Sequence, residues 1–314
     1  MQTNQAVVAA KIETSYGIDA VPTGTEAVGV FDFSPPDITG DLIERDLYKN
    51  NNSLSPIVIG KKIVEGSFKM EVKGAGAVYS AIVKPEIDPI LRAAGFSSTL
   101  DDGTPGAEKY TYAPVSSGYE SMTLYIWVGG ILHKIPGCHA SVKLLAEAGK
   151  RAVFNVTYKG LFVAPVDMPI ISPTLSSVLP PIVENAGLSL GAYANGIYTK
   201  FELDVGVEIK ERLDVNSPEG LWGVQIRGRK PSASIDPLAV TEATKPFWDN
   251  WKNGTQEALS ITIGSTLYNR IVVSAPAVQM SSVKWGDSDG ERSYDLPIRP
   301  CGVTGDDEFS LLFS

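Results

Sequence analysis

The chain has 314 residues, of which 43% are hydrophobic and 20% charged, which is typical of a globular protein long enough for two domains. Its formal net charge of -9 opposes binding to DNA or to an anionic membrane, because the phosphates would be repelled. The two cysteines, Cys138 and Cys301, are too few and too far apart to indicate a disulfide framework. We expect neither an export signal nor a membrane segment, since no basic start or long apolar run is present.

Three elements are predicted in the first half. Residues 41–56 mix both charge signs with hydrophobes and contain an asparagine run, which predicts a protruding loop between two strands. Residues 63–73 alternate between apolar and polar side chains, the pattern of a half-buried antiparallel strand. Residues 84–95 open on Pro85 and end at Gly95, which predicts a short helix whose apolar stripe covers a sheet face.

The second half contains the same kinds of predicted element after a proline-rich segment. Residues 164–187 contain five prolines and predict a linker, since neither a helix nor a sheet accommodates so many. Residues 201–210 then alternate like a strand with an acidic outer face, and residues 245–254 predict a second short helix. Glycines between strand-like runs, at Gly149 and Gly290, predict that each half finishes in a hairpin.

Three stretches of sequence recur in the same chain order, which indicates one fold present twice. They are Ile59–Lys62 with Arg227–Lys230, Leu124–Ile135 with Leu259–Ile271, and Val142–Arg151 with Val283–Arg292. We therefore predict a first module over residues 1–165, a linker over 166–190 and a second module over 191–314.

One motif suggests an enzyme but lacks the required context. Gly187–Gly191 fits the nucleophile elbow of α/β-hydrolases, which needs a strand before the serine and a helix after it. Here the motif follows the proline-rich linker and precedes a strand-like run, so Ser189 is not a credible nucleophile. We expect no catalytic residue.

Two further motifs suggest metal sites and fail on ligand count. His133, Cys138 and His139 lie close in sequence, but a fourth zinc ligand is missing and alternation along a strand turns Cys138 away from the histidines. Asp287–Gly290 resembles part of a calcium loop without its closing glutamate, and a hairpin turn explains it more simply. We expect no metal and no cofactor.

Four segments resemble the major tail tube proteins of long-tailed, non-contractile (siphovirus-type) bacteriophages. The resemblance implies a mainly β fold built from tail-tube modules, each a β-sandwich or barrel with one short flanking α-helix, that form rings which stack into a tube. Wider-family rings use six modules, so a chain with two modules implies a trimer per ring. The matching segments are Glu13–Asp19, Ile90–Phe96, Tyr110–Ser121 and Leu132–Gly137.

The resemblance also implies partners and a location. These are copies of the chain itself, a terminator, a tape measure and a distal tail protein, with DNA only in transit, in a virion tail assembled in the host cytoplasm. For stacking between rings we expect Glu44, Arg45, Asp46, Tyr48 and Lys49, and for the lumen the acids Glu202, Asp204 and Glu208.

Alternatives stay open at this point. Residues 41–56 are equally explained as a solvated loop without a partner, and the acids as part of the outer wall. Another ring-forming tail component or a secretion-type tube protein would share the fold. A carbohydrate-binding β-sandwich is the alternative from a different class, because five tryptophans offer aromatic platforms for sugars.

Overall fold

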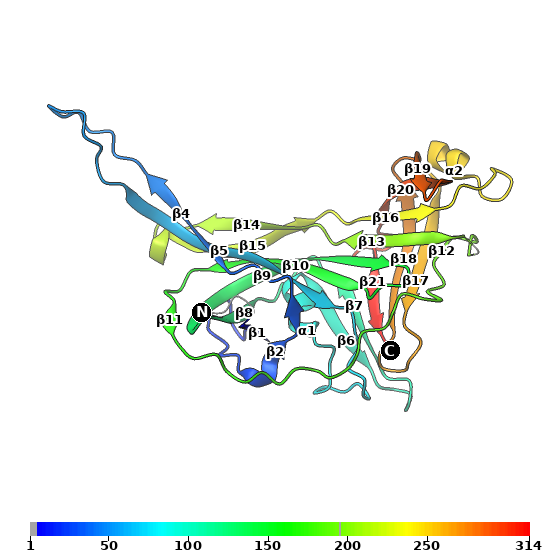
Figure 1. Ribbon diagram of the computed structural model, residues 1–314, viewed down its shortest axis with the longest axis horizontal. Coiled ribbons are helices and arrows are strands. Elements are labelled where there is room, and N and C mark those ends of the chain that lie inside the picture. Colours follow the sequence, from blue (N-terminus) through cyan, green and yellow to red (C-terminus); the bar gives the residue numbers. More distant parts are fainter. Residues whose placement is uncertain (1–4, 195) are drawn as a thin grey trace.

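A computed structural model describes residues 5–194 and 196–314, and the fold is mainly β with two short helices (Figure 1). The mainly β prediction is confirmed. The strands of the first half are β1 (Ala6–Ile12), β2 (Ala27–Val28), β3 (Val30–Phe31), β4 (Asp37–Ile43), β5 (Val58–Glu71), β6 (Phe96–Asp101), β7 (Lys109–Pro114), β8 (Met122–Val128), β9 (Ile131–Glu147) and β10 (Val153–Leu161). Those that follow are β11 (Val166–Asp167), β12 (Ser189–Leu190), β13 (Tyr198–Asp204), β14 (Val207–Leu213), β15 (Leu221–Arg229), β16 (Ser232–Pro237), β17 (Gln256–Ile263), β18 (Ile271–Met280), β19 (Lys284–Ser288), β20 (Glu291–Cys301) and β21 (Ser310–Phe313).

Strands pair in the same order in the two halves, and every pair is antiparallel. In the first half the order is β1-β8-β9-β10-β5-β4, and in the second it is β12-β17-β18-β20-β16-β13. A register shift interrupts β8–β9 just before Leu124 and interrupts β17–β18 just before Leu259. Residues in the two halves can therefore be matched by their place in the ladders.

The two predicted helices follow strands that have the same place in the pairing order, α1 (Asp88–Ala93) after β5 and α2 (Phe247–Asn253) after β16. Helix α1 buries Ile90 and Leu91 completely, as its stripe predicts. Helix α2 ends at Gly254 in the left-handed conformation, the expected C-terminal glycine, but only Phe247 of its stripe is buried. Within the part of the chain described, no helix is long and apolar enough to cross a membrane.

Both predicted hairpins form, and the acidic strand differs from its prediction. The turns at Gly149 and at Asp289–Gly290 join β9 to β10 and β19 to β20. Residues 201–210 do not form one strand, because the chain bends at Gly206, which has a φ of +62°. Strand β13 before the bend pairs with β16 and β9, whereas β14 after it pairs with β15 alone. Alternation continues through the bend, so periodicity does not reveal the change of partner.

Two strand pairs join the halves. The outer edge of β9 pairs with β13, from Lys200 opposite Glu147 to Asp204 opposite Lys143. The C-terminal strand β21 lies between β18 and β7, so Phe313 is opposite both Ile271 and Tyr110. The hydrophobic core continues across both junctions. Among the described residues between β10 and β13, which include the predicted linker, the secondary structure consists of the short strands β11 and β12 and isolated bridges.

A buried carboxylate in the first half predicts a large stability effect. Glu13 accepts hydrogen bonds from the backbone N of Gly17 (2.8 Å) and Gly137 (2.7 Å) and from the hydroxyls of Ser121 (2.6 Å) and Thr123 (2.7 Å). Glu13→Ala would leave several buried donors without a partner, so we expect it to lower the free energy of unfolding by about 3 kcal/mol. Glu13→Gln keeps one acceptor oxygen and should lose less. Urea denaturation measures both, and a loss below about 1 kcal/mol for alanine would contradict the expectation.

Candidate assembly surfaces

Each half extends one β-hairpin beyond its body. We name residues 40–62 (the outer parts of β4 and β5 with their loop) the first arm, and residues 207–229 (β14 and β15 with their loop) the second arm. The second arm lies along the strands β5, β9 and β10, whereas the first projects away from the molecule (Figure 1).

The two arms share one register. In the first arm Gly40 is opposite Lys62 and, after a register shift, Leu42 is opposite Ile59. In the second arm Val207 is opposite Arg229 and, after a shift at the same place, Ile209 is opposite Ile226. This register matches the dipeptide Glu44-Arg45 to Glu211-Arg212, and it matches Leu54, Ile57 and Ile59 to Leu221, Val224 and Ile226.

The second arm is held on the first body by an apolar cluster. Leu221 and Val224 are buried together with Ile63 of β5, and Ile209 and Leu161 pack around them. Beside the cluster, the ring of Tyr16 stacks on Trp222 with centroids 4.9 Å apart, and the Tyr16 hydroxyl accepts a hydrogen bond from the backbone N of Val224 at 2.6 Å. A side chain at Gly223 would collide with the Tyr16 ring, so the close approach requires glycine there.

Charge complementarity supports the same contact. Glu211 of the second arm lies 2.8 Å from the Nζ of Lys61 and 3.0 Å from that of Lys159, and Glu219 pairs with Lys62. The hydrogen bond from Lys61, with the help of Lys159, holds the pKa of Glu211 below its ordinary value. Lys159 of the first body, with Lys61 and Lys62 at the base of the first arm, thus supplies cations to the acids of the second arm.

Acid should therefore weaken the docking of the second arm. Because the folded-state pKa of Glu211 is lowered, its contribution is complete above the ordinary glutamate pKa and is lost as the pH falls through the folded value. We expect the wild type to lose about 1 kcal/mol more than Glu211→Gln between pH 7 and pH 3.5. Urea denaturation at the two pH values measures the difference, and equal losses would show that the ion pairs contribute nothing.

The structure places the five predicted stacking residues together on the first arm. Glu44, Arg45, Asp46, Tyr48 and Lys49 are all exposed, and they lie between β4 and β5 as the loop prediction requires. The hydrophobic residues Leu42, Leu54, Ile57 and Ile59 of the same arm are exposed too; Leu54 is 96% exposed, whereas its counterpart Leu221 is 4% exposed. This apolar set is absent from the sequence prediction. The repeated Glu-Arg dipeptide is the signal that would have revealed it.

The predicted lumen acids lie near the bend between β13 and β14, and lysines balance two of them. Glu202 lies 2.9 Å from Lys143 and also pairs with Lys200, and Glu208 lies 3.1 Å from Lys210. Asp204 accepts a hydrogen bond from the backbone N of Gly206 at 2.8 Å. The face is therefore mixed in charge rather than uniformly acidic.

Two of the strand edges that have no partner among the described residues belong to β19 and to the segment β3–β4. Strand β19 pairs on one side with β20, and the segment β3–β4 pairs on one side with β5. The matched registers make β19 the counterpart of the end of β9, and they make residues 33–37, which lead from β3 into the first residue of β4, the counterpart of the part of β13 that pairs with β9. Strands β9 and β13 join the halves within the chain. Unpaired edges expose backbone donors and acceptors that another chain can bind.

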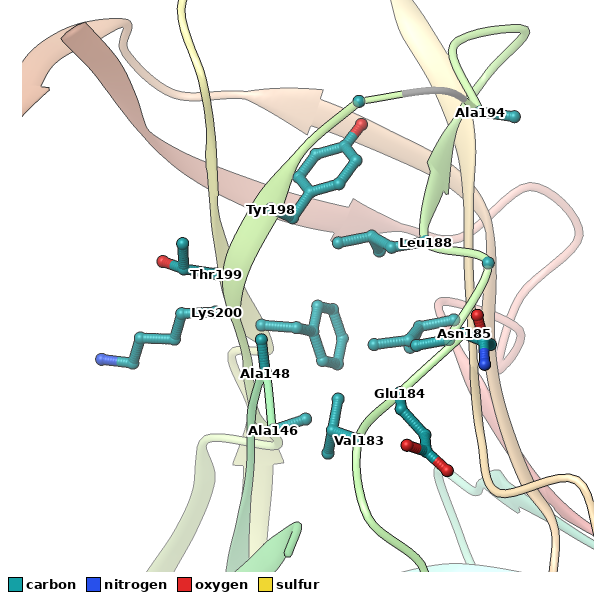
Figure 2. A pocket seen from close by; sticks show the side chains of 15 residues that line it. Ala146, Ala148, Val183, Glu184, Asn185, Leu188, Ala194, Tyr198, Thr199 and Lys200 are labelled. Carbon is teal, nitrogen blue, oxygen red and sulfur yellow. The ribbon is translucent and has the colours of Figure 1, made fainter. Parts of the chain in front are cut away.

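A pocket of about 250 Å³ lies where the linker crosses the β9–β13 junction. Figure 2 shows Ala146, Val183, Leu188 and Tyr198 around it, with the charged ends of Glu184 and Lys200 at its margin. These side chains offer no nucleophile beside a base, so the pocket indicates packing between the halves rather than catalysis.

The motifs that resemble enzyme and metal sites have structural roles. Ser189 lies in β12 opposite Ser260, and a turn rather than a helix follows it. His139 is buried with its Nδ1 3.1 Å from the carbonyl oxygen of Ala93, and burial lowers its pKa. Within residues 5–194 and 196–314, no group of three or more His, Cys, Asp and Glu side chains is placed to hold a metal ion. The Asp287 carboxylate accepts the backbone N–H of Gly290, closing the hairpin turn.

Comparison with known proteins gives one family. The family described as phage tail tube protein matches residues 3–300, nearly the whole chain. Among curated proteins, no relative matches. The match spans both arms and both unpaired edges, and it agrees with the resemblance carried by the sequence segments. The chain belongs to the phage tail tube protein family.

Proposed function

We propose that this protein is the major tail tube subunit of a long-tailed, non-contractile phage, and that three chains close each ring of the tube. Membership in the family makes it a structural component of a virion tail that assembles with itself and with other tail proteins. The proposal adds that the chain carries two copies of one tube module, so that three chains supply six modules and mimic sixfold symmetry. No chemistry is assigned to it.

The observation that carries the proposal is the junction inside the chain. Strand β9 of the first half joins β13 of the second, and their counterparts, β19 and residues 33–37, each have a free edge among the described residues. Repeating the internal junction between chains pairs β19 of one subunit with the β3–β4 edge of the next, at residues 33–37. Such a head-to-tail contact generates a ring when its rotation closes, and closure pairs these two edges.

The tube would conduct DNA without binding it. A net charge of -9 offers the genome few cationic contacts. We retain Glu202, Asp204 and Glu208 as the proposed lumen face, where the lysines beside Glu202 and Glu208 keep the local field small. The terminator, the tape measure and the distal tail protein are the proposed partners at the tube ends and inside it, with assembly in the host cytoplasm.

Assembly of the purified chain tests the function. We expect concentrated protein, or protein seeded with tube fragments, to form stacked rings visible by negative-stain electron microscopy. A ring that never stacks would favour a terminator. A chain that stays monomeric with seeds and binds glycans would favour the carbohydrate-binding alternative and overturn the proposal.

The tip of the first arm is the proposed contact between rings. Tyr48 and Lys49 lie in the loop between β4 and β5, and the Tyr48 side chain is fully exposed. We expect Tyr48→Ala combined with Lys49→Ala to leave single rings and to shorten the tubes strongly, because stacking buries these side chains. Tube length in electron micrographs measures the effect. Tubes of normal length and yield would exclude the tip from stacking.

A further inference from the structure

The second body carries a groove at the place where the first body receives an arm. Its volume is about 710 Å³. The ladders identify the correspondence, because Tyr158 opposite Gly66 in the first half matches Ile298 opposite Ala233 in the second. The residues that line the groove include Lys230, Ser232, Ser281, Pro297, Arg299 and Cys301.

The groove keeps the charge that the first body uses to hold an arm. By the matched registers, Arg299 is the counterpart of Lys159, which binds Glu211 of the second arm at 3.0 Å. Cys301 is the counterpart of Leu161, which packs against the apolar cluster under that arm. Within the described chain, neither Lys230 nor Arg299 forms an ion pair, whereas Arg229, which also lines the groove, is paired with Glu308. The groove therefore offers two cations without an acid partner.

The first arm has the complementary surface. Its exposed residues Leu54, Ile57 and Ile59 match Leu221, Val224 and Ile226, of which Val224 is 0% exposed on the first body. Glu44, at the base of the loop, is the counterpart of Glu211 and offers an acid to the cations of the groove that have no ion-pair partner within the chain. The first arm therefore exposes the kind of apolar surface that the second arm buries.

The first arm does not reach the groove of its own chain. In Figure 1 it projects on the side away from β16, β18 and β20, which carry the groove. Resting on the proposed tube function, we propose that the first arm of each subunit docks in the groove on the second body of the neighbouring subunit in the same ring. Its apolar face covers the region of Cys301, and Glu44 pairs with Arg299. The contact repeats between chains what the second arm does within one chain.

Docking should also order the base of the arm. The ladder of the second arm continues as far as Leu213 opposite Leu221, whereas that of the first ends at Ile43 opposite Val58. Because both arms have the same length in register, the docked first arm is expected to gain the missing pairs. Amide protection at Glu44 and Ile57 should rise when rings form.

Disulfide trapping tests the contact, with Cys301 as a native reporter and Cys138 buried and inaccessible. Ile57→Cys tubes treated with diamide, which takes up the two electrons and two protons of the thiols, should yield covalent dimers and trimers on non-reducing gels. Trimers should be the largest species, because three arms close one ring. Tyr48→Cys at the tip is the matched control, and Ile57→Cys with Cys301→Ser should give no link.

The outcomes separate the two proposals. Tubes that form normally but give no cross-link would overturn the docking and leave the tube function standing. A ladder of species beyond the trimer would place the contact between rings and overturn its assignment to one ring. Wild-type chains that form no ring with seeds would overturn the proposed function itself.

Discussion

Ile57→Asp is expected to raise the protein concentration needed for tube formation while leaving the free chain as stable as the wild type, whereas Val224→Asp is expected to destabilise the free chain. The two residues occupy the same position in the two arms. Val224 is completely buried on the first body, where a carboxylate costs about 4 kcal/mol of folding free energy. Ile57 is 51% exposed in the free chain, so a polar replacement there should change stability by less than about 0.5 kcal/mol.

Assembly should be weakened by Ile57→Asp, because Ile57 is a proposed anchor of the contact between chains. Removing a central apolar anchor from an interface costs about 2 kcal/mol, which corresponds to a roughly 30-fold higher concentration for assembly at each contact. Urea denaturation of the monomer and sedimentation of tubes measure the two quantities separately. If Ile57→Asp assembled at the wild-type concentration, the first arm would have no buried partner in the tube.

Lys284→Glu is the second change with a large expected effect, and it tests the proposed pairing of β19 with the β3–β4 edge of the next chain. Within the chain, Lys143 of β9 lies opposite Asp204 and forms an ion pair with Glu202. The counterparts of Lys143 and Asp204 are Lys284 on β19 and Asp37 on β4, and neither forms an ion pair among the described residues. Pairing β19 with the β3–β4 edge of the next chain places Lys284 of one chain opposite Asp37 of the other.

Reversing one charge puts like charges opposite each other at every junction. Each costs about 1 kcal/mol, so three junctions lower the formation constant of the ring by about 100-fold. Asp37→Lys in the same chain should restore assembly, whereas it should not rescue Lys143→Glu, whose partners lie within the chain. Sedimentation of the single and double variants measures this. A double variant no better than Lys284→Glu would disprove the pairing.

Local signals predicted much of the fold. The glycine after each helix, Pro246 before α2, the glycines of the two hairpin turns and the alternation over residues 63–73 all lead to elements that the structure contains. The first helix starts later than predicted, at Asp88 rather than at Pro85. The bend at Gly206 escaped prediction because the apolar and polar residues keep alternating while the strand changes partner. The period of apolar and polar residues shows which face of a strand is buried, but it does not show which strand lies beside it.

The assembly surfaces were only half visible in the sequence. Charged residues and the asparagine run made residues 41–56 resemble a polar loop, and they masked the apolar residues Leu54 and Ile57. Those two have no partner within the chain, so only their match to the buried Leu221 and Val224 gives them a meaning. The repeated Glu-Arg dipeptide indicates that match in the sequence, and the strand registers of the structure establish it.

The number of chains in one ring tests the central claim most directly. End-on class averages of purified tubes, with the mass of released rings from native mass spectrometry, would count them. The proposal of two equivalent modules in each chain predicts three chains and a sixfold outline. Six chains per ring would contradict the claim, because each chain would then contribute a single module.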